Sequence, residues 1–300
     1  MTTPGLSGQP SASDSPSLIA RRDPARQAFE MKFLLDETRA AELRMWARER
    51  LTLDPHGDAA LDGAYHIASL YLDTPAMDVY RRTPGYTRRK YRVRRYGALP
   101  WVFLERKSRR GDRVSKRRTS VPLEELARLA QPTLINRLDP AAQLNGAASN
   151  GHAAAEWAGE WFRRQTATRG LLPACGIAYE RTAFFASVNE APVRLTFDRD
   201  MRGTPASGWL LSDQAGQTPV PSMVRAGADA CAAGGTDGTV VVRPLLQGRV
   251  IVEMKFLDAV PHLFREALTR FRLSPTPVSK YRLCRDAWGA ATSASEVVRA

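Results

Sequence analysis

The pentapeptide Glu-Met-Lys-Phe-Leu stands at residues 30–34 and again at residues 253–257, near opposite ends of the chain. Successive side chains of a β-strand point to opposite faces of a sheet. In each copy the glutamate and the lysine therefore share one face, and the methionine and the phenylalanine share the other. Each copy predicts a strand with one apolar face and one face that carries both signs of charge.

The same alternation recurs elsewhere, and the charged faces carry Lys90, Arg92 and Arg94 in residues 88–96, Glu105 and Lys107 in residues 102–107, and Arg194 and Asp198 in residues 193–199. A half-exposed strand can turn such charges to water. Cations that recur on strand after strand fit this explanation less well, because a face with many cations repels itself unless it meets an anion. The pattern favours a barrel with apolar side chains outside and a charged interior that binds a polyanion.

Alternation and turn residues predict about eight strands, at residues 28–35, 65–73, 88–96, 100–109, 115–121, 174–188, 193–199 and 249–256. Helices are expected at residues 38–51, with Thr38 as the N-cap, and at residues 123–129, 157–168 and 260–271. Residues 279–284 are expected to form a last strand. Short links favour antiparallel pairing, and eight strands suffice to close a barrel around a ligand. The expected fold class is α+β, an eight-stranded antiparallel β-barrel with flanking helices.

Composition divides the chain into a folded region and flexible segments. Residues 1–26 are rich in Thr, Pro, Gly and Ser and predict a disordered tail, residues 27–289 predict the domain, and residues 290–300 predict a C-terminal tail. Flexible insertions are expected at about residues 140–152 and 202–236, which are rich in small residues.

The net charge of +13 predicts an anionic partner, either nucleic acid, an anionic membrane or a phosphate-rich ligand. Nucleic acid is not expected, because the chain shows no helix-turn-helix, zinc-finger or RRM signature. The three cysteines, Cys175, Cys231 and Cys284, form no metal-binding or disulfide pattern. No apolar run is long enough for a membrane helix and no signal peptide is evident, so a cytoplasmic location is expected.

Several short motifs follow one another in a definite order. They include Lys-Tyr-Arg-Val-Arg-Arg-Tyr-Gly, Phe-Leu-Glu-Arg-Lys, Ser-Lys-Arg-Arg, Tyr-Glu-Arg-Thr-Ala-Phe, Arg-Leu-Thr-Phe-Asp-Arg-Asp, Val-Glu-Met-Lys-Phe and Ser-Lys-Tyr. Their order resembles the vacuolar transporter chaperone (VTC) polyphosphate polymerase domain, of the triphosphate tunnel metalloenzyme or CYTH-like superfamily. The resemblance implies a tunnel of eight antiparallel strands. It also implies transfer of the γ-phosphate of ATP onto polyphosphate with Mn²⁺ or Mg²⁺.

The resemblance implies that phosphates are held by Lys32, Arg92, Arg94, Lys107, Lys116, Arg181, Arg194 and Lys280, and a metal by Glu253. The strand pattern adds Lys90 and Lys255 as phosphate-binding candidates, and Glu30 and Glu105 as further metal ligands or lysine partners. Carboxylate oxygens suit Mg²⁺ or Mn²⁺. The four arginines would form the catalytic clamp on the transferring phosphate. Asp198 is expected to orient an arginine. A solvated rim that attracts polyanions is expected from Arg109, Arg110, Arg113, Arg117 and Arg118.

Two other functions remain open at this point. A triphosphatase on the same fold would cleave a triphosphate with water, and a module without catalysis would only bind polyphosphate or another polyanion. The motifs locate the site but do not identify the acceptor, the preferred metal or the oligomeric state.

Overall fold

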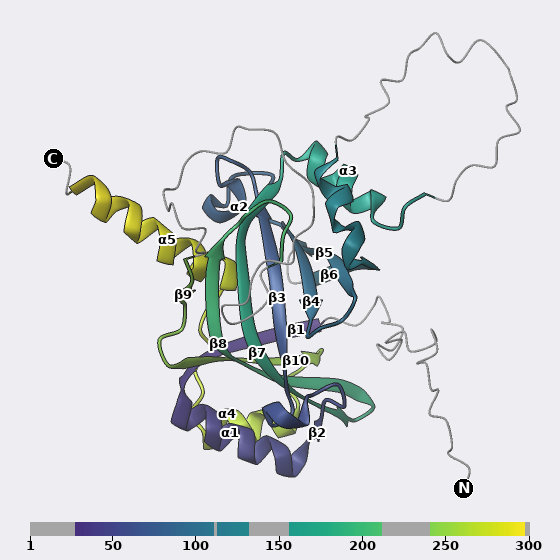
Figure 1. Ribbon diagram of the computed structural model, residues 1–300. Coiled ribbons are helices and arrows are strands. Elements are labelled where there is room, and N and C mark those ends of the chain that lie inside the picture. The colour runs from purple at the N-terminus through teal and green to yellow at the C-terminus, as the bar shows by residue number, and fades with distance from the viewer. Residues whose placement is uncertain (1–27, 111–112, 132–155, 212–240, 298–300) are drawn as a thin grey trace, which may run out of the picture.

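The computed structural model of the protein describes residues 28–110, 113–131, 156–211 and 241–297 (Figure 1). The expected N-terminal tail and the insertion at residues 140–152 lie outside these ranges. So does most of the second expected insertion. Its first residues are an exception, because residues 202–205 continue a strand. Within the described ranges, no helix is both long and apolar enough to cross a membrane.

Ten strands of the described chain form one antiparallel sheet: β1 (Ala28–Asp36), β2 (Thr52–Leu53), β3 (Ala64–Asp73), β4 (Arg89–Tyr96), β5 (Trp101–Arg110), β6 (Arg113–Pro122), β7 (Leu172–Val188), β8 (Ala191–Pro205), β9 (Arg243–Pro244) and β10 (Arg249–Leu257). The hydrogen-bonded order is β1-β10-β8-β7-β3-β4-β5-β6, and the short strands β2 and β9 pair with β7 and β8. The mostly antiparallel sheet with a few helices is confirmed.

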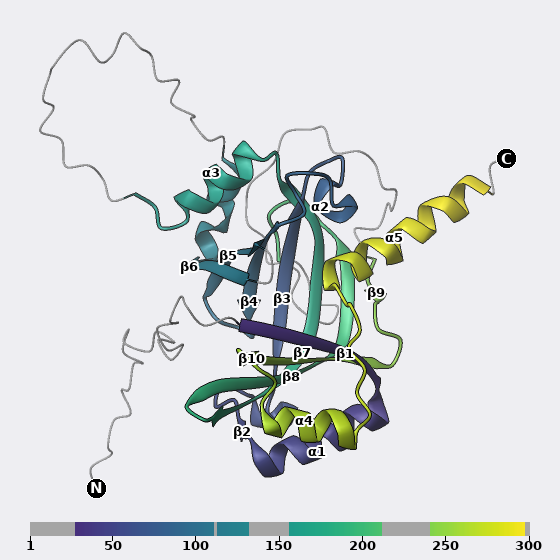
Figure 2. The same ribbon diagram turned by 180° about the vertical axis from the view of Figure 1, so that it is seen from behind.

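Closure of the sheet into a barrel is not confirmed, because the strand order is linear and no pairing of β1 with β6 occurs among the described residues. The sheet is instead strongly curved, and β1 and β10 cross the direction of β3 and β7 (Figures 1 and 2). Side chains connect the two ends of the curve. The Lys107 ammonium of β5 lies 3.2 Å from the Glu30 carboxylate of β1. The open edge of β1 is also partly satisfied, because Thr276 donates its N–H to the Lys32 carbonyl.

The helices are α1 (Glu37–Arg50), α2 (Asp78–Arg81), α3 (Glu160–Thr168), α4 (His262–Arg270) and α5 (Lys280–Val297), with 3₁₀ turns η1 (Ala59–Leu61) and η2 (Leu123–Ala130). The N-cap of α1 is Asp36 rather than Thr38. The Asp36 carboxylate accepts the Arg39 N–H at 2.8 Å, which satisfies a donor of the first turn.

The prediction of a last strand at residues 279–284 is wrong, because helix α5 begins at Lys280. Tyr281 and Cys284 are three residues apart and both are buried, which is the spacing of one helix face. The helix continues to Val297, through the segment expected to be a C-terminal tail. It brings Lys280 to the concave side of the sheet.

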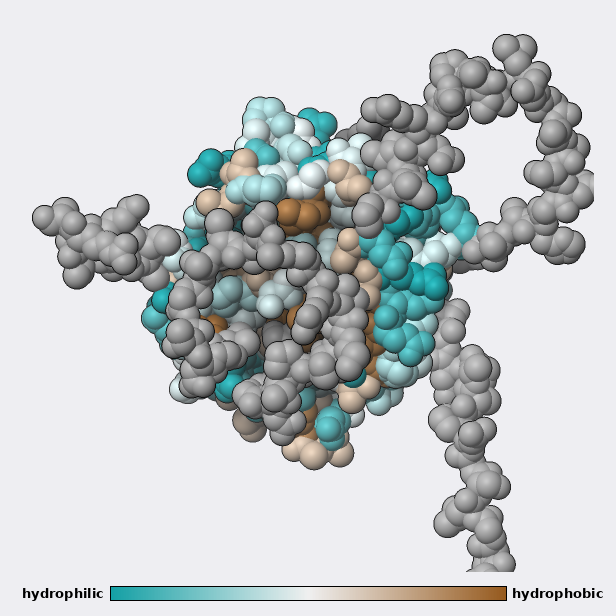
Figure 3. All heavy atoms as spheres, turned by 45° about the horizontal axis from the view of Figure 1, so that its top comes forward, coloured by the Kyte–Doolittle hydropathy of each residue, from teal (hydrophilic) through white to brown (hydrophobic). Residues whose placement is uncertain are grey.

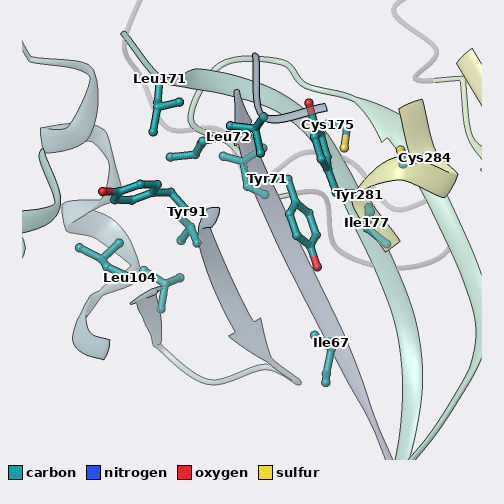
Figure 4. Close-up of a cluster of buried hydrophobic side chains, with 14 of the residues drawn as sticks. Ile67, Tyr71, Leu72, Tyr91, Leu104, Leu171, Cys175, Ile177, Tyr281 and Cys284 are labelled. Atoms are coloured by element: carbon teal, nitrogen blue, oxygen red, sulfur yellow. The ribbon is translucent and has the colours of Figure 1, made fainter. Parts of the chain in front are cut away.

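Two apolar clusters stabilise the sheet, one on its convex side and one on both sides of its other half. Helices α1 and α4 cover β1, β8 and β10 through a cluster that includes Leu43, Phe33 and Phe264, all fully buried. The other cluster has a convex part under α3, where Tyr91 packs edge-on against Phe162. Its concave part lies under α5, where Tyr71, the strand neighbour of Arg92, stacks on Tyr281. In Figure 4, Cys175 of β7 and Cys284 of α5 lie side by side. Burying these surfaces fixes which face of each strand remains for the charged side chains.

Gly203 of β8 lets helix α5 approach the sheet, because a Cβ built there would lie 2.7 Å from the Cys284 sulfur and 3.1 Å from Leu245. We expect Gly203→Ala to lower the free energy of unfolding by about 1–3 kcal/mol, as overpacking of a core does. Urea denaturation measures this. The double variant Gly203→Ala/Cys284→Ala should lose less than the sum of the single variants. Strict additivity would show that this contact does not set the distance of α5.

Candidate functional site

One face of the sheet gathers the charged side chains of seven strands, and we call it the charged face. Strand pairing sets its neighbours. Glu253 of β10 lies between Lys32 of β1 and Thr196 of β8, and Arg181 of β7 lies opposite Asp198 of β8. The members are Glu30, Lys32, Lys90, Arg92, Arg94, Glu105, Lys107, Lys116, Arg118, Arg181, Arg194, Asp198, Glu253 and Lys255 from the strands, and Lys280 from α5. Basic side chains clearly outnumber carboxylates in this set.

Glu105 holds three cations on the β4–β6 side of the charged face. Its carboxylate accepts from Nε of Arg92 at 2.7 Å and from Nε of Arg118 at 2.7 Å, and the Lys116 ammonium lies 2.6 Å away. Burial alone would raise the pKa of Glu105, but the surrounding arginines and Lys116 lower it well below its usual range. Glu105 therefore stays ionised and serves as the anchor of a cationic cluster.

Glu30 and Glu253 share their lysines on the opposite side. The Lys32 ammonium lies 2.5 Å from Glu30 and 2.6 Å from Glu253, and Lys255 lies 3.6 Å and 3.4 Å from the same two carboxylates. Burial and the neighbouring Glu253 raise the pKa of Glu30, but Lys255, Lys32 and Lys107 lower it to about 2. Both carboxylates are thus negatively charged at neutral pH.

A buried ion cluster extends from Glu253 of β10 to β8, β7 and α5. Arg181 donates from Nε and Nη2 to the two oxygens of Asp198 at 2.6 and 2.7 Å, which is the bidentate geometry that fixes a guanidinium most firmly. The Lys280 ammonium lies 2.6 Å from Asp198 and 3.3 Å from Glu253. Asp198 thus orients an arginine, as its position in the sequence led us to expect.

Arg94 differs from the other buried arginines. It is 4% exposed, yet it donates its hydrogen bonds to neutral groups, from Nε to the Ser69 hydroxyl at 3.1 Å and from Nη2 to the Tyr179 hydroxyl at 3.0 Å. Burying a cation without a directly bonded anion is costly. The charge also acts on its neighbours. Burial raises the pKa of the Tyr96 phenol, but Arg94 and Arg118 lower it to about 7.

Arg194 and Lys90 lie toward the edges of the charged face. Arg194 donates from Nη2 to the Tyr65 hydroxyl at 3.1 Å and stacks on Phe185 at 4.8 Å from the ring centre. Lys90 lies 3.4 Å from the Ser279 hydroxyl, just before α5, and burial lowers its pKa. Figure 3 shows hydrophilic side chains along the flank where Figure 1 draws β5 and β6.

The donor set of Glu30 and Glu253 suits a divalent cation. Mg²⁺ is commonly held by one or two protein carboxylates and completes its coordination with water and substrate phosphates. Among the described residues, no group of three or more His, Cys, Asp or Glu side chains is arranged for a metal. The pair is therefore suited to a metal that arrives with phosphates. Glu105 is separate from this pair and is occupied by Arg92, Lys116 and Arg118.

Sequence reasoning missed part of the site. Arg118 was expected on a solvated rim, but its guanidinium binds Glu105, donates to the Tyr96 hydroxyl at 2.6 Å and stacks on Phe103. The prediction is wrong for Arg118 because Arg117 and Arg118 alternate, and only Arg117 turns away, onto Trp161. Ser69, Tyr96, Tyr179 and Thr196 carry no charge, so strand alternation was the only signal that could have placed them here.

Strands β7 and β8 carry two ion pairs on opposite faces, Arg181–Asp198 on the charged face and Glu180–Arg199 on the other. The two can therefore be compared by matched substitutions. We expect Asp198→Asn to cost about 3–5 kcal/mol of unfolding free energy, since it leaves Arg181 and Lys280 buried beside a neutral group. Glu180→Gln should cost about 1 kcal/mol or less, because that pair is partly exposed. Chemical denaturation of both variants measures the difference, and equal losses would contradict the assignment.

Comparison with known proteins gives a family match and a set of similar solved structures. No curated protein matches the chain. Similar solved structures include a candidate adenylyl cyclase from Hippeastrum with a dominant triphosphatase activity (TM-score 0.42, 14% identity, covering 86% of this chain and 95% of that one). They also include a candidate adenylate cyclase from Bacillus halodurans (TM-score 0.42, 12% identity, covering 84% and 94%). A third, from Pyrococcus horikoshii, has a TM-score of 0.39 and 11% identity, and covers 86% and 99%.

The model of the VTC domain family matches residues 27–288. This range begins just before β1 and ends within α5, so it includes every strand of the charged face. The chain belongs to the VTC domain family.

Proposed function

We propose that this protein is a metal-dependent phosphoryl transferase that moves the γ-phosphate of ATP onto polyphosphate, bound along the charged face. The observation that carries the proposal is Arg94, a buried guanidinium hydrogen-bonded only to neutral hydroxyls among the described residues. A bound phosphate oxygen would supply the missing counter-charge at the centre of a face that already carries an excess of cations. ATP or another triphosphate and polyphosphate are the expected ligands.

The residues of the charged face would bind and orient the two phosphate chains. Arg92 and Arg181 are held by carboxylates, so their positions are fixed before any ligand binds. Such preorganised cations stabilise the charge that develops on a transferring phosphoryl group without having to reorganise during the step. Arg94 and Arg194 would complete the clamp. Lys32, Lys90, Lys107, Lys116, Lys255 and Lys280 would hold the remaining phosphates as point charges.

Glu253 and Glu30 would hold the metal, Mn²⁺ or Mg²⁺, which would neutralise part of the negative charge of the bound phosphates. The Lys32 ammonium now lies between the two carboxylates. We infer that Lys32 turns toward phosphate when the site is loaded, because one position between two carboxylates cannot hold both cations.

The acceptor decides between transfer and hydrolysis. The end of a polyphosphate chain is already anionic and needs little help from a general base. Water would need one. The charged face offers two groups that titrate near neutrality. One is Tyr96, and the other is Lys116, whose pKa burial lowers to about 8 although Glu105 opposes this. They favour a triphosphatase as the second candidate function.

The proposal is tested by incubating the protein with ATP and Mn²⁺ or Mg²⁺, with and without a short polyphosphate primer. Products are resolved on a gel stained for polyphosphate while free phosphate is measured. We expect a lengthening ladder that Glu253→Gln reduces by about a hundredfold or more, as loss of a metal-holding charge would. The matched control is Glu180→Gln, on the other face of the sheet, which should retain the ladder.

Other products would contradict the transferase. Release of phosphate without a ladder would identify a triphosphatase. Binding of polyphosphate with neither product would identify a module without catalysis. Thermal denaturation of Glu253→Gln and Glu180→Gln shows whether each variant is folded, so that a lost ladder is not confused with a lost fold.

Binding should depend on pH through Tyr96. Its pKa of about 7 means that the phenol is neutral below pH 7 and negatively charged above it, so rising pH adds a charge that repels phosphate. Between pH 6 and 8, we expect tripolyphosphate affinity of the wild type to fall relative to Tyr96→Phe, by up to about tenfold. Titration calorimetry in EDTA measures both proteins, so ionisation of the ligand cancels in the ratio. A constant ratio would show that Tyr96 does not ionise there.

A further inference from the structure

Thr196 lies at the middle of the charged face but has no partner for its hydroxyl. It is fully buried, and its Oγ1 makes no hydrogen bond within the described structure. Its strand neighbours are Glu253 on β10 and Ala183 on β7. A buried hydroxyl without a hydrogen bond is uncommon and destabilising, because it loses its hydrogen bonds to water on folding and gains none within the protein. A valine of the same shape would fold at least as well at this position.

A second unsatisfied donor lies on the same strand and the same face. The Nε of Arg194, two residues before Thr196, is shielded from solvent and has no hydrogen-bond partner in the described structure. The Nη2 of that guanidinium donates to the Tyr65 hydroxyl and lies 3.9 Å from the Asp54 carboxylate. An arginine Nε–H can only donate, so the group that satisfies it must be an acceptor.

The surroundings select the kind of acceptor. Ala183 of β7 is a small strand neighbour of Thr196, and Arg194 and Asp198 flank Thr196 along β8. Lys255 lies opposite Arg194 and adds a third cationic or donor group. Burial lowers the pKa of Lys255, although Glu253 and Glu30 oppose this. An acceptor placed here would meet the Thr196 O–H, the Arg194 Nε–H and the ammonium of Lys255, which suits a phosphate oxygen. The carboxylates of Glu253 and Asp198, next to Thr196, are already paired with lysine or arginine.

We propose that the Thr196 hydroxyl and the Arg194 Nε–H form a phosphate-oxygen subsite on β8, next to Glu253. The proposal rests on the proposed function only for the class of ligand, a polyphosphate or triphosphate chain. Within that function, the subsite holds an oxygen of the phosphate nearest Glu253 and so positions that phosphate beside the carboxylate. Thr196 is a positioning residue here and takes up no proton in the reaction.

The test is tripolyphosphate binding in EDTA, measured by titration calorimetry on full-length wild type, Thr196→Val, Thr196→Ser and Arg194→Lys. Thr196→Val removes only the hydroxyl, Thr196→Ser keeps it, and Arg194→Lys keeps the charge but removes the Nε–H. We expect Thr196→Val and Arg194→Lys to weaken binding about tenfold to a hundredfold, as loss of a hydrogen bond to a charged group does. Thr196→Ser should bind within about threefold of the wild type.

Thermal denaturation without ligand separates a binding role from a structural one. The hydroxyl is unpaired in the ligand-free protein, so the Tm of Thr196→Val should equal or exceed that of the wild type. Wild-type affinity in Thr196→Val, with a lowered Tm, would overturn the proposal and show that the hydroxyl binds a structural water. Weakened binding in Thr196→Val together with absent phosphoryl transfer in the wild type would support the subsite and refute the proposed function.

Discussion

The buried ion cluster of Arg181, Asp198, Lys280 and Glu253 is the interaction on which the rest of the site depends. It joins β7, β8, β10 and the start of α5 at one point. Each charge in it is stable only while its partners remain, because an unpaired charge in the interior costs several kcal/mol. The cluster therefore fixes the relative positions of the strands that carry the phosphate-binding side chains, and it fixes where α5 begins.

The two faces of the sheet contribute to this arrangement in different ways. The convex face supplies much of the stabilising free energy, through apolar clusters under α1, α4 and α3, and α5 adds an apolar contact at one end of the concave side. That stability allows the other face to keep more cations than carboxylates at close range, which is unfavourable in the ligand-free protein. Arg94 shows this most clearly, since it is buried and bonded only to neutral groups among the described residues. Binding a polyanion relieves the repulsion among these cations, and this relief contributes to the binding free energy.

The carboxylates of the charged face have separate roles. Glu105 fixes three cations and lies apart from the other acids, while Glu30 and Glu253 share Lys32 and Lys255. A shared lysine is a replaceable counter-ion, because its single charge and flexible stem can move to a phosphate when a divalent cation binds the carboxylates. A bidentate pair such as Arg181–Asp198 is much harder to exchange. The site thus combines fixed guanidinium groups with mobile ammonium groups.

The sequence by itself determined the strands and which face of each is charged, because alternation in segments such as 30–34 and 88–96 depends only on the period of a β-strand. It also determined the family, since ordered motifs are a property of the chain. The tertiary structure alone decided the rest. Closure depends on contacts between distant strands, and the described sheet proved curved but open. The pairing of β1 with β10 brings Glu30 next to Glu253 and leaves Glu105 apart from both. Packing against the sheet made residues 280–284 a helix rather than a strand. Uncharged members such as Thr196 gave no signal in the sequence, because their role arises only from the neighbours that folding places around them.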